Sequence, residues 1–177
     1  MSLYRHPPND GPVVCMDEMG PLETIPRGGG SWGRTPARRP DRYRRNGTIQ
    51  MLAAFAPHLG RGMGRCVHHK TGMEILRFLS KDLLKSFPRG RIHLIMDNLS
   101  AHKIPAILDW QSNNSRRIVF HWLPTNSSWL NLIEPWFAVL EKTALHNTYL
   151  KTTGEIQEHL MRGIRYLNEH PRPYTWN

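Results

Sequence analysis

Two short, mainly apolar runs, each followed directly by an aspartate, restrict the fold of this chain more than any other feature. Val13–Met16 precedes Asp17, and Ile92–Met96 precedes Asp97. Apolar, β-branched runs of this length indicate buried strands. An unpaired carboxylate is costly inside a core, so we expect both acids at the carboxyl ends of their strands. Open α/β sheets bind ligands at those ends, which makes Asp17 and Asp97 candidate functional residues.

The remaining pattern predicts an α/β fold with elements in the order βββαβαβα and an extra C-terminal helix. Gly60 lies between the second and third strands and predicts an antiparallel hairpin there. The last two strands are joined by a crossover that can hold a helix, so they should be parallel. The expected strands cover 13–16, 48–55, 62–69, 91–96 and 117–123, and the expected helices cover 71–87, 105–111, 129–144 and 152–167.

A third acid, Glu134, lies at the edge of the apolar stripe of the expected helix over 129–144. Pro135 follows it directly, and because proline fits only the first turn of a helix, we expect a late start or a kink here. Glu141, two turns further on the same side, is a weaker alternative. Glu18 ranks below Asp17, since its side chain would point to the opposite face if the strand continues.

Three carboxylates with no Lys or Arg directly beside them in the sequence repel one another. A divalent cation relieves that repulsion, and hard oxygen ligands select Mg²⁺ or Mn²⁺. Each acid taken alone is explained equally well as a turn residue or a helix-cap residue. The three acids together, placed on this order of strands and helices, favour a metal site. A zinc motif at Cys66, His68 and His69 is weak, because it lacks a second ligand pair.

The formal net charge of +10 is concentrated in one arm. Residues 27–45 hold seven arginines and one acid, Asp41, and so carry six of the ten net charges. Glycines and prolines there predict a long loop or irregular arm over 27–47. Arginines interleaved with Trp32 and Tyr43 suit phosphate contact and base stacking, whereas the alternative is a polar loop without a partner. The arginines are Arg27, Arg34, Arg38, Arg39, Arg42, Arg44 and Arg45.

Length and composition exclude several classes of protein. The 177 residues are enough for one domain with a hydrophobic core. No apolar run approaches the length of a membrane span, and the N-terminus has no signal-peptide core. The two cysteines exclude a disulfide scaffold and favour a reducing compartment.

Three segments resemble the signature blocks of the DDE transposases and are most similar to the IS630 branch of the IS630/Tc1/mariner superfamily. The most specific is the second, Asp-Asn-x-x-x-His-Lys. Residues 123–128 and 168–176 also resemble the family, so the resemblance spans nearly the whole chain. Asp97 and Glu134 are separated by 36 residues, slightly more than is usual, and one small loop insertion would account for this. The three segments are Val14–Glu18, Met96–Lys103 and Trp129–Trp136.

The resemblance implies an RNase H-like fold, with a mixed five-stranded sheet flanked by helices. It implies Asp17, Asp97 and Glu134 as catalytic acids that bind two Mg²⁺ or Mn²⁺ ions. Asn98 and His102 would be auxiliary residues, and His102 would either contact DNA or orient Asp97. The implied activity is DNA strand cleavage and 3′-OH strand transfer in cut-and-paste transposition, acting on transposon ends and target DNA.

Members of this family usually carry an N-terminal helix-turn-helix region, and only 16 residues precede Asp17. We therefore expect a catalytic domain alone over 13–177, with an extension over 1–12. The resemblance implies a homodimer on DNA, a separate helix-turn-helix subunit, and a nucleoid-associated, cytoplasmic location in a prokaryotic host.

Two other interpretations stay open. One is a different RNase H-like nuclease, against which the Asp-Asn-x-x-x-His-Lys block argues. The other is an inactive transposase remnant that acts as a non-specific DNA-binding protein, against which the intact acid triad argues.

We expect the arm to supply most of the non-specific DNA affinity. If about four of its arginines touch phosphates, replacing those four with Gln should flatten the slope of log K against log salt by about 3–4 units, at ~0.9 per phosphate. Titration of one duplex at several salt concentrations measures this slope. An unchanged slope would place the DNA elsewhere on the protein.

Overall fold

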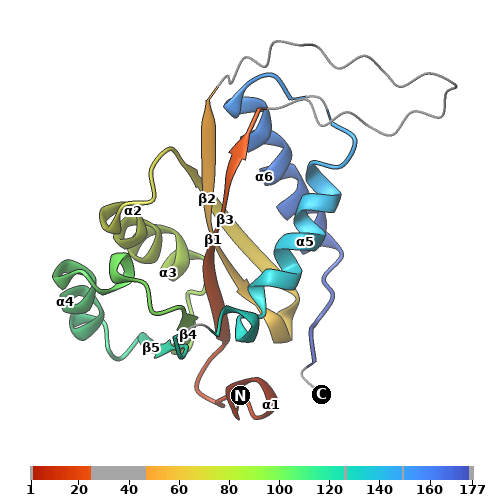
Figure 1. The fold of residues 1–177 in the computed structure, drawn as a ribbon. Coiled ribbons are helices and arrows are strands. Elements are labelled where there is room, and N and C mark those ends of the chain that lie inside the picture. Colours follow the sequence, from red (N-terminus) through yellow and green to blue (C-terminus); the bar gives the residue numbers. More distant parts are fainter. Residues whose placement is uncertain (1, 25–46, 126, 149, 176–177) are drawn as a thin grey trace, which may run out of the picture.

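One mixed sheet of five strands organises the computed structural model, which describes residues 2–24, 47–125, 127–148 and 150–175 (Figure 1). The strand order is β3-β2-β1-β4-β5, with β1–β2 and β2–β3 antiparallel and β1–β4 and β4–β5 parallel. The expected hairpin and parallel half are therefore confirmed. The strands are β1 (Val13–Glu23), β2 (Thr48–Ala56), β3 (Arg61–Val67), β4 (Ile92–Met96) and β5 (Ile118–Trp122).

Helices cover both faces of the sheet (Figure 1): α2, α3 and α4 pack on one face, and α5 and α6 on the other. None of the described helices is long and apolar enough to cross a bilayer. The α-helices are α1 (Ser2–Arg5), α2 (Gly72–Arg77), α3 (Leu84–Ser86), α4 (Pro105–Asn113), α5 (Ile133–Ala144) and α6 (Thr153–Glu169). A π-helical segment, η2 (Phe78–Leu83), joins α2 to α3, and 3₁₀ turns form η1 (Pro57–Leu59), η3 (Ser100–Lys103) and η4 (Ser128–Leu130).

The alternation of side chains along β1 divides the apolar residues into two cores. Val14 and Met16 pack on the side of α2 and α4, whereas Cys15 and Met19 pack on the side of α5 and α6. All four are buried. By the same alternation Asp17 faces the α5–α6 side, and the neighbouring Glu18 faces the opposite side.

The expected strand end at Asp17 is wrong. β1 continues to Glu23 because β2 pairs with it beyond the apolar run, with Asp17 opposite Ala53 and Glu18 opposite Leu52. Only the parallel pairing with β4 ends early, at the pair Cys15–Ile95. Asp17 therefore lies on a continuing strand, just past the point where the pairing with its parallel neighbour stops.

The helix expected from residue 129 also begins later, at Ile133. The segment before it forms η4 and then Asn131, whose extended backbone interrupts the helical pattern. Pro135 consequently occupies the first turn of α5, where a backbone N–H has no helical acceptor and proline costs little. The late start that Pro135 predicted is confirmed, and Glu134 lies at the amino end of the helix.

Helix α6 is fixed to the edge strand β3 by one side chain. The Asn168 amide donates to the Gly62 carbonyl at 2.8 Å and accepts from the Gly62 N–H at 2.9 Å. Trp136 of α5 lies over the same glycine, and its ring stacks on Phe55 of β2 with centroids 5.4 Å apart. The absence of a side chain at Gly62 therefore allows α5 and α6 to pack closely on the sheet.

Replacing Gly62 with Ala should destabilise the fold. A Cβ at this position would lie 2.2 Å from Cζ2 of the buried Trp136 ring, and overpacking of this kind costs about 1–3 kcal/mol. Chemical denaturation measures the decrease in stability. Gly154→Ala is the matched control, because its Cβ would meet only Thr152 Oγ1 at 3.8 Å. Equal stability of Gly62→Ala and the parent chain would contradict this packing.

Candidate active site

Three elements bring the acids Asp17, Asp97 and Glu134 together. Cys15 of β1 is the parallel partner of Ile95 of β4, so Asp17 and Asp97 both lie two residues beyond the same pair on adjacent strands. Adjacent strands are about 4.8 Å apart. Glu134 is exposed in the first turn of α5, whose amino end is tied to β1 next to Asp17.

Asn131 makes the connection between β1 and α5. Its side-chain amide donates to the Met16 carbonyl at 3.0 Å and to Asp17 Oδ2 at 3.2 Å, while its oxygen accepts from the Ile133 N–H at 3.4 Å. Asn131 is fully buried. Sequence reasoning missed its role, although one polar amide inside the apolar run around Leu130 and Leu132 was an available signal.

The carboxylate of Asp17 is held in an unfavourable environment. Burial raises its pKa from 3.8 to about 6, and the negative charges of Glu18, Asp97 and Glu134 add to the increase, which outweighs the hydrogen bond from the Glu18 N–H. The three acids therefore interact through their charges. Among the described residues, however, no three His, Cys, Asp or Glu side chains converge as ligands of a bound ion would.

His102 holds the second acid in place. It is fully buried in η3, with Nδ1 2.7 Å from Asp97 Oδ1 and Nε2 2.7 Å from Glu18 Oε1. Burial opposes protonation, but the hydrogen bond to Glu18 and the charges of Glu18 and Asp97 outweigh it and raise the pKa of His102 above its usual value. Of the two expected roles, this geometry favours orientation of Asp97 over contact with DNA.

Other expected residues are less constrained. Asn98 is exposed in the segment after β4. Glu141 lies two turns beyond Glu134 on α5, about 10 Å along the helix axis. Burial raises the pKa of the Cys66 thiol to about 11, which disfavours the thiolate that zinc requires. The seven arginines of the arm, Arg27 to Arg45, lie outside the described residues.

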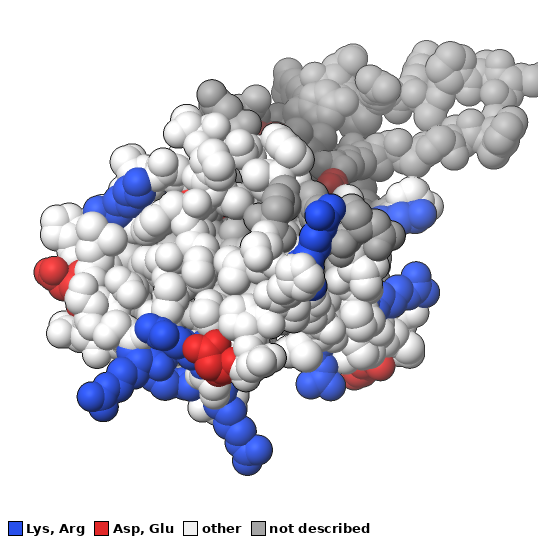
Figure 2. Space-filling model, turned by 90° about the horizontal axis from the view of Figure 1, so that it is seen from below, with Lys and Arg blue, Asp and Glu red and all other residues white. Residues whose placement is uncertain are grey.

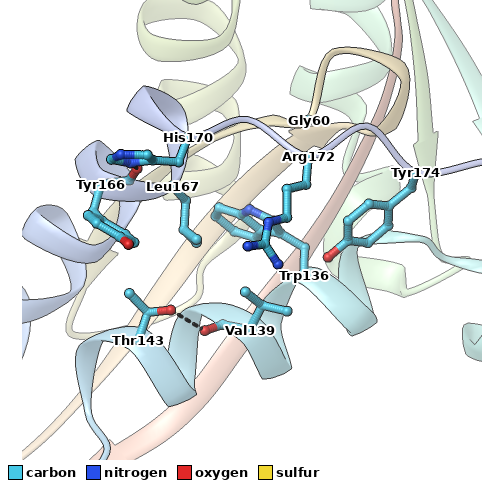
Figure 3. Close-up of a pocket in the computed structure, with 9 residues that line it drawn as sticks. All are labelled: Gly60, Trp136, Val139, Thr143, Tyr166, Leu167, His170, Arg172 and Tyr174. Carbon is cyan, nitrogen blue, oxygen red and sulfur yellow. Dashed lines mark hydrogen bonds between the residues drawn. The ribbon is translucent and has the colours of Figure 1, made fainter.

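A cavity of 420 Å³ lies between α5, α6 and the segment that follows α6 (Figure 3). Trp136, Leu167 and Tyr174 form much of its apolar wall, and Arg172 adds a positive charge. None of the three acids lines it. The candidate active site is therefore the carboxylate cluster rather than this cavity.

Replacing Asp17 with Asn should change how stability depends on pH. The folded chain binds the Asp17 proton more tightly than the unfolded chain does, because the pKa rises from 3.8 to about 6 on folding. The contribution of Asp17 to the free energy of unfolding is therefore present at low pH and is lost as the pH rises from about 4 to above 6. The free energy of unfolding of the parent should fall more steeply over this window than that of Asp17→Asn.

Urea denaturation without divalent cations at several pH values tests this. His102 titrates in both chains, so the difference between the two curves reports Asp17. Asp109→Asn, at an exposed position on α4, is the control and should follow the parent. Parallel curves for Asp17→Asn and the parent would show that Asp17 is not perturbed.

Comparison with known proteins now identifies the family. A family model described as DDE superfamily endonuclease matches residues 12–157. No curated protein matches the chain. Among solved structures, a chain of the simian T-cell lymphotropic virus intasome, in complex with the PP2A regulatory subunit B56 gamma, is similar with a TM-score of 0.58 and 13% identity.

That similarity covers 85% of this chain and 47% of the other, so this chain spans about half the length of its structural neighbour. At this identity the likeness concerns the fold, and it supports the expected RNase H-like architecture with a mixed five-stranded sheet. Because the family match covers most of the sequence, the chain belongs to the DDE superfamily of endonucleases.

Proposed function

We propose that residues 13–177 form the catalytic domain of an IS630-type transposase, which cleaves DNA at transposon ends and joins the freed 3′-OH to target DNA. The observation that carries this proposal is geometric: parallel pairing sets Asp17 level with Asp97, and Asn131 ties the helix that carries Glu134 to Asp17, in a chain of the DDE family. The Asp-Asn-x-x-x-His-Lys block from Asp97 to Lys103 supports the assignment to the IS630 branch.

The chemistry of the three acids suits Mg²⁺ or Mn²⁺, and binding would require their side chains to converge further than they do in this structure. All three side chains offer hard oxygen ligands, and no described Lys or Arg forms an ion pair with any of them. Asp17, Asp97 and Glu134 would hold these ions. Bound ions would activate an attacking oxygen and stabilise the departing one in an in-line displacement.

The surrounding residues orient these carboxylates. Asn131 and the Glu18 N–H each donate to one oxygen of Asp17, and together they fix the plane of that carboxylate. His102 fixes Oδ1 of Asp97 and leaves its other oxygen for a ligand. Asn131 and His102 are therefore positioning residues, and their own atoms need not touch the DNA.

The reaction is a phosphodiester exchange. A water oxygen would attack phosphorus, the bond between phosphorus and the 3′ oxygen would break, and the 3′ oxygen would leave as a hydroxyl. That hydroxyl would then attack a phosphorus of the target strand and form a new bond to it, while the bond between this phosphorus and the target 3′ oxygen would break. The proton lost by the attacking hydroxyl balances the proton that the departing 3′ oxygen takes up as it leaves as a hydroxyl. The arm over 27–47 would bind DNA phosphates, and we infer a homodimer on DNA, with recognition of transposon ends supplied by a helix-turn-helix subunit.

Asp97→Asn should abolish Mg²⁺-dependent strand cleavage and leave the fold intact. Asp97 supplies a ligand oxygen and no core packing, since it lies just after β4 in a partly exposed position. Cleavage of a labelled duplex with a transposon end measures activity, and circular dichroism measures folding. If the parent also cleaves a scrambled duplex and Asp97→Asn does not, the protein would instead be a general nuclease of the same fold.

Binding of the metal can be measured without activity. Mg²⁺ should raise the Tm of the parent chain, because it relieves repulsion among the carboxylates, and should raise that of Asp97→Asn less. Asp109→Asn is again the control and should respond as the parent does. Equal cleavage by Asp97→Asn and the parent would overturn the assignment, and a parent with neither cleavage nor a Mg²⁺ response would support the inactive DNA-binding remnant.

A further inference from the structure

Four arginines lie where the parallel strands β4 and β5 begin. Arg89 and Arg91 precede β4, and Arg116 and Arg117 precede β5. The two strands start level with one another, because Ile92 pairs with Ile118 and the Ile92 N–H donates to the Arg117 carbonyl at 2.8 Å. The two loops are therefore neighbours, and we call these four residues the strand-start arginines.

Hydrogen bonds between the loops hold two of these side chains in place. The Arg117 guanidinium donates to the carbonyls of Gly90 and of Phe87, the latter at 2.8 Å. Arg91 donates across to the Ser115 carbonyl at 2.9 Å. These acceptors are neutral, so the positive charges are positioned without being neutralised.

The other two side chains, Arg89 and Arg116, are exposed, and no described acid forms an ion pair with either. The acid near this cluster is Asp10, whose pKa is lowered chiefly by a hydrogen bond to His93 and also by the charge of Arg91. Asp10 offsets at most one of the four positive charges. Seen from below, Lys and Arg side chains gather at the lower left of the view, and other basic side chains lie apart from them around the outline (Figure 2).

These arginines lie at the opposite end of β4 from the candidate active site. Arg91 precedes the strand and Asp97 follows it. Six residues of extended chain separate them by about 20 Å, at ~3.3 Å per residue. The strand-start arginines and the carboxylates therefore lie at opposite ends of β4, too far apart to contact the same phosphate.

The chemistry of this surface favours phosphate. Guanidinium groups bind phosphate oxygens with two parallel hydrogen bonds and are weakly hydrated. Leu59, Met73, Leu99, Leu108, Trp129, Val139 and Tyr166 are the exposed large apolar side chains of the described chain, and none comes from these two loops. Aromatic side chains are enriched at the core of protein interfaces, and Trp, Phe and Leu line the apolar face of membrane-binding helices.

We propose that the strand-start arginines bind the phosphates of a second DNA duplex, so that one chain holds two duplexes at once. The inference rests on the proposed function for the first duplex, which would lie at the carboxylate cluster and the arm. In a transposition reaction this surface would hold DNA other than the strand being cut.

A bridging experiment tests the inference. A biotinylated duplex on beads is loaded with the full chain in EDTA, which prevents cleavage, and a second, fluorescent duplex of unrelated sequence is added. The test variant is Arg89→Gln/Arg116→Gln, because neither side chain makes a described contact that the fold needs. The control is Arg162→Gln/Arg165→Gln, which removes the same charge from exposed positions on α6. Circular dichroism confirms that both variants fold.

The parent and the α6 control should capture the second duplex, whereas the strand-start variant should capture at least about fivefold less. For the captured duplex, the slope of log K against log salt should fall by about 2 units, at ~0.9 for each phosphate that the variant no longer binds. Binding of the first duplex to the beads should stay within about twofold in all three chains.

The possible failures are distinguishable. Equal capture by the strand-start variant and the parent overturns this inference alone, and it is also the result expected if bridging comes from two arms of a dimer. Equally reduced capture in both variants shows that only overall charge matters and overturns it as well. A parent chain that binds no duplex at all overturns the proposed function together with this inference.

Discussion

The parallel pairing of β1 with β4 is the contact on which the candidate active site depends. It is short, running from Val13–His93 to Cys15–Ile95, yet it sets Asp17 and Asp97 level on neighbouring strands. β4 and β5 are also parallel, so the strand-start arginines that precede them lie together at the opposite end of the sheet. One topological choice therefore separates a negatively charged end of the sheet from a positively charged one.

Bringing the acids together has an energetic cost that the rest of the fold must offset. Asp17 is partly desolvated beside three other carboxylates, and its raised pKa records that cost. The compensation is local: Asn131 and the Glu18 N–H hydrogen-bond Asp17, and His102 lies between Asp97 and Glu18. A histidine in this position can carry positive charge, so it reduces the repulsion between Asp97 and Glu18.

Much of the architecture could be predicted from local patterns, because buried strands and amphipathic helices leave periodic signals. The hairpin, the parallel half and Asp97 after β4 followed in this way. The continuation of β1 did not, because Gly20 and Pro21 normally interrupt a strand and only its pairing with the distant β2 maintains it. Asn131 and the contact between His102 and Glu18 were likewise hidden, since each joins residues more than 80 positions apart. Long-range partners of this kind leave no periodicity in the sequence.

Glu134 differs from the other two acids because a helix, not a strand, carries it. Its position therefore depends on how firmly α5 is held, and the contacts that hold α5 lie on the side of the helix that faces the sheet. Trp136, two residues later, is packed between Phe55 and the bare backbone of Gly62, while Asn168 binds the same glycine from α6. At the amino end of α5, Asn131 ties the chain to β1. Because α5 is packed at one of these places and hydrogen-bonded at the other, its contacts define the backbone position from which the exposed Glu134 side chain extends. An exposed carboxylate on a packed helix can change its rotamer without any rearrangement of the core, whereas the carboxylates of Asp17 and Asp97 are held by hydrogen bonds.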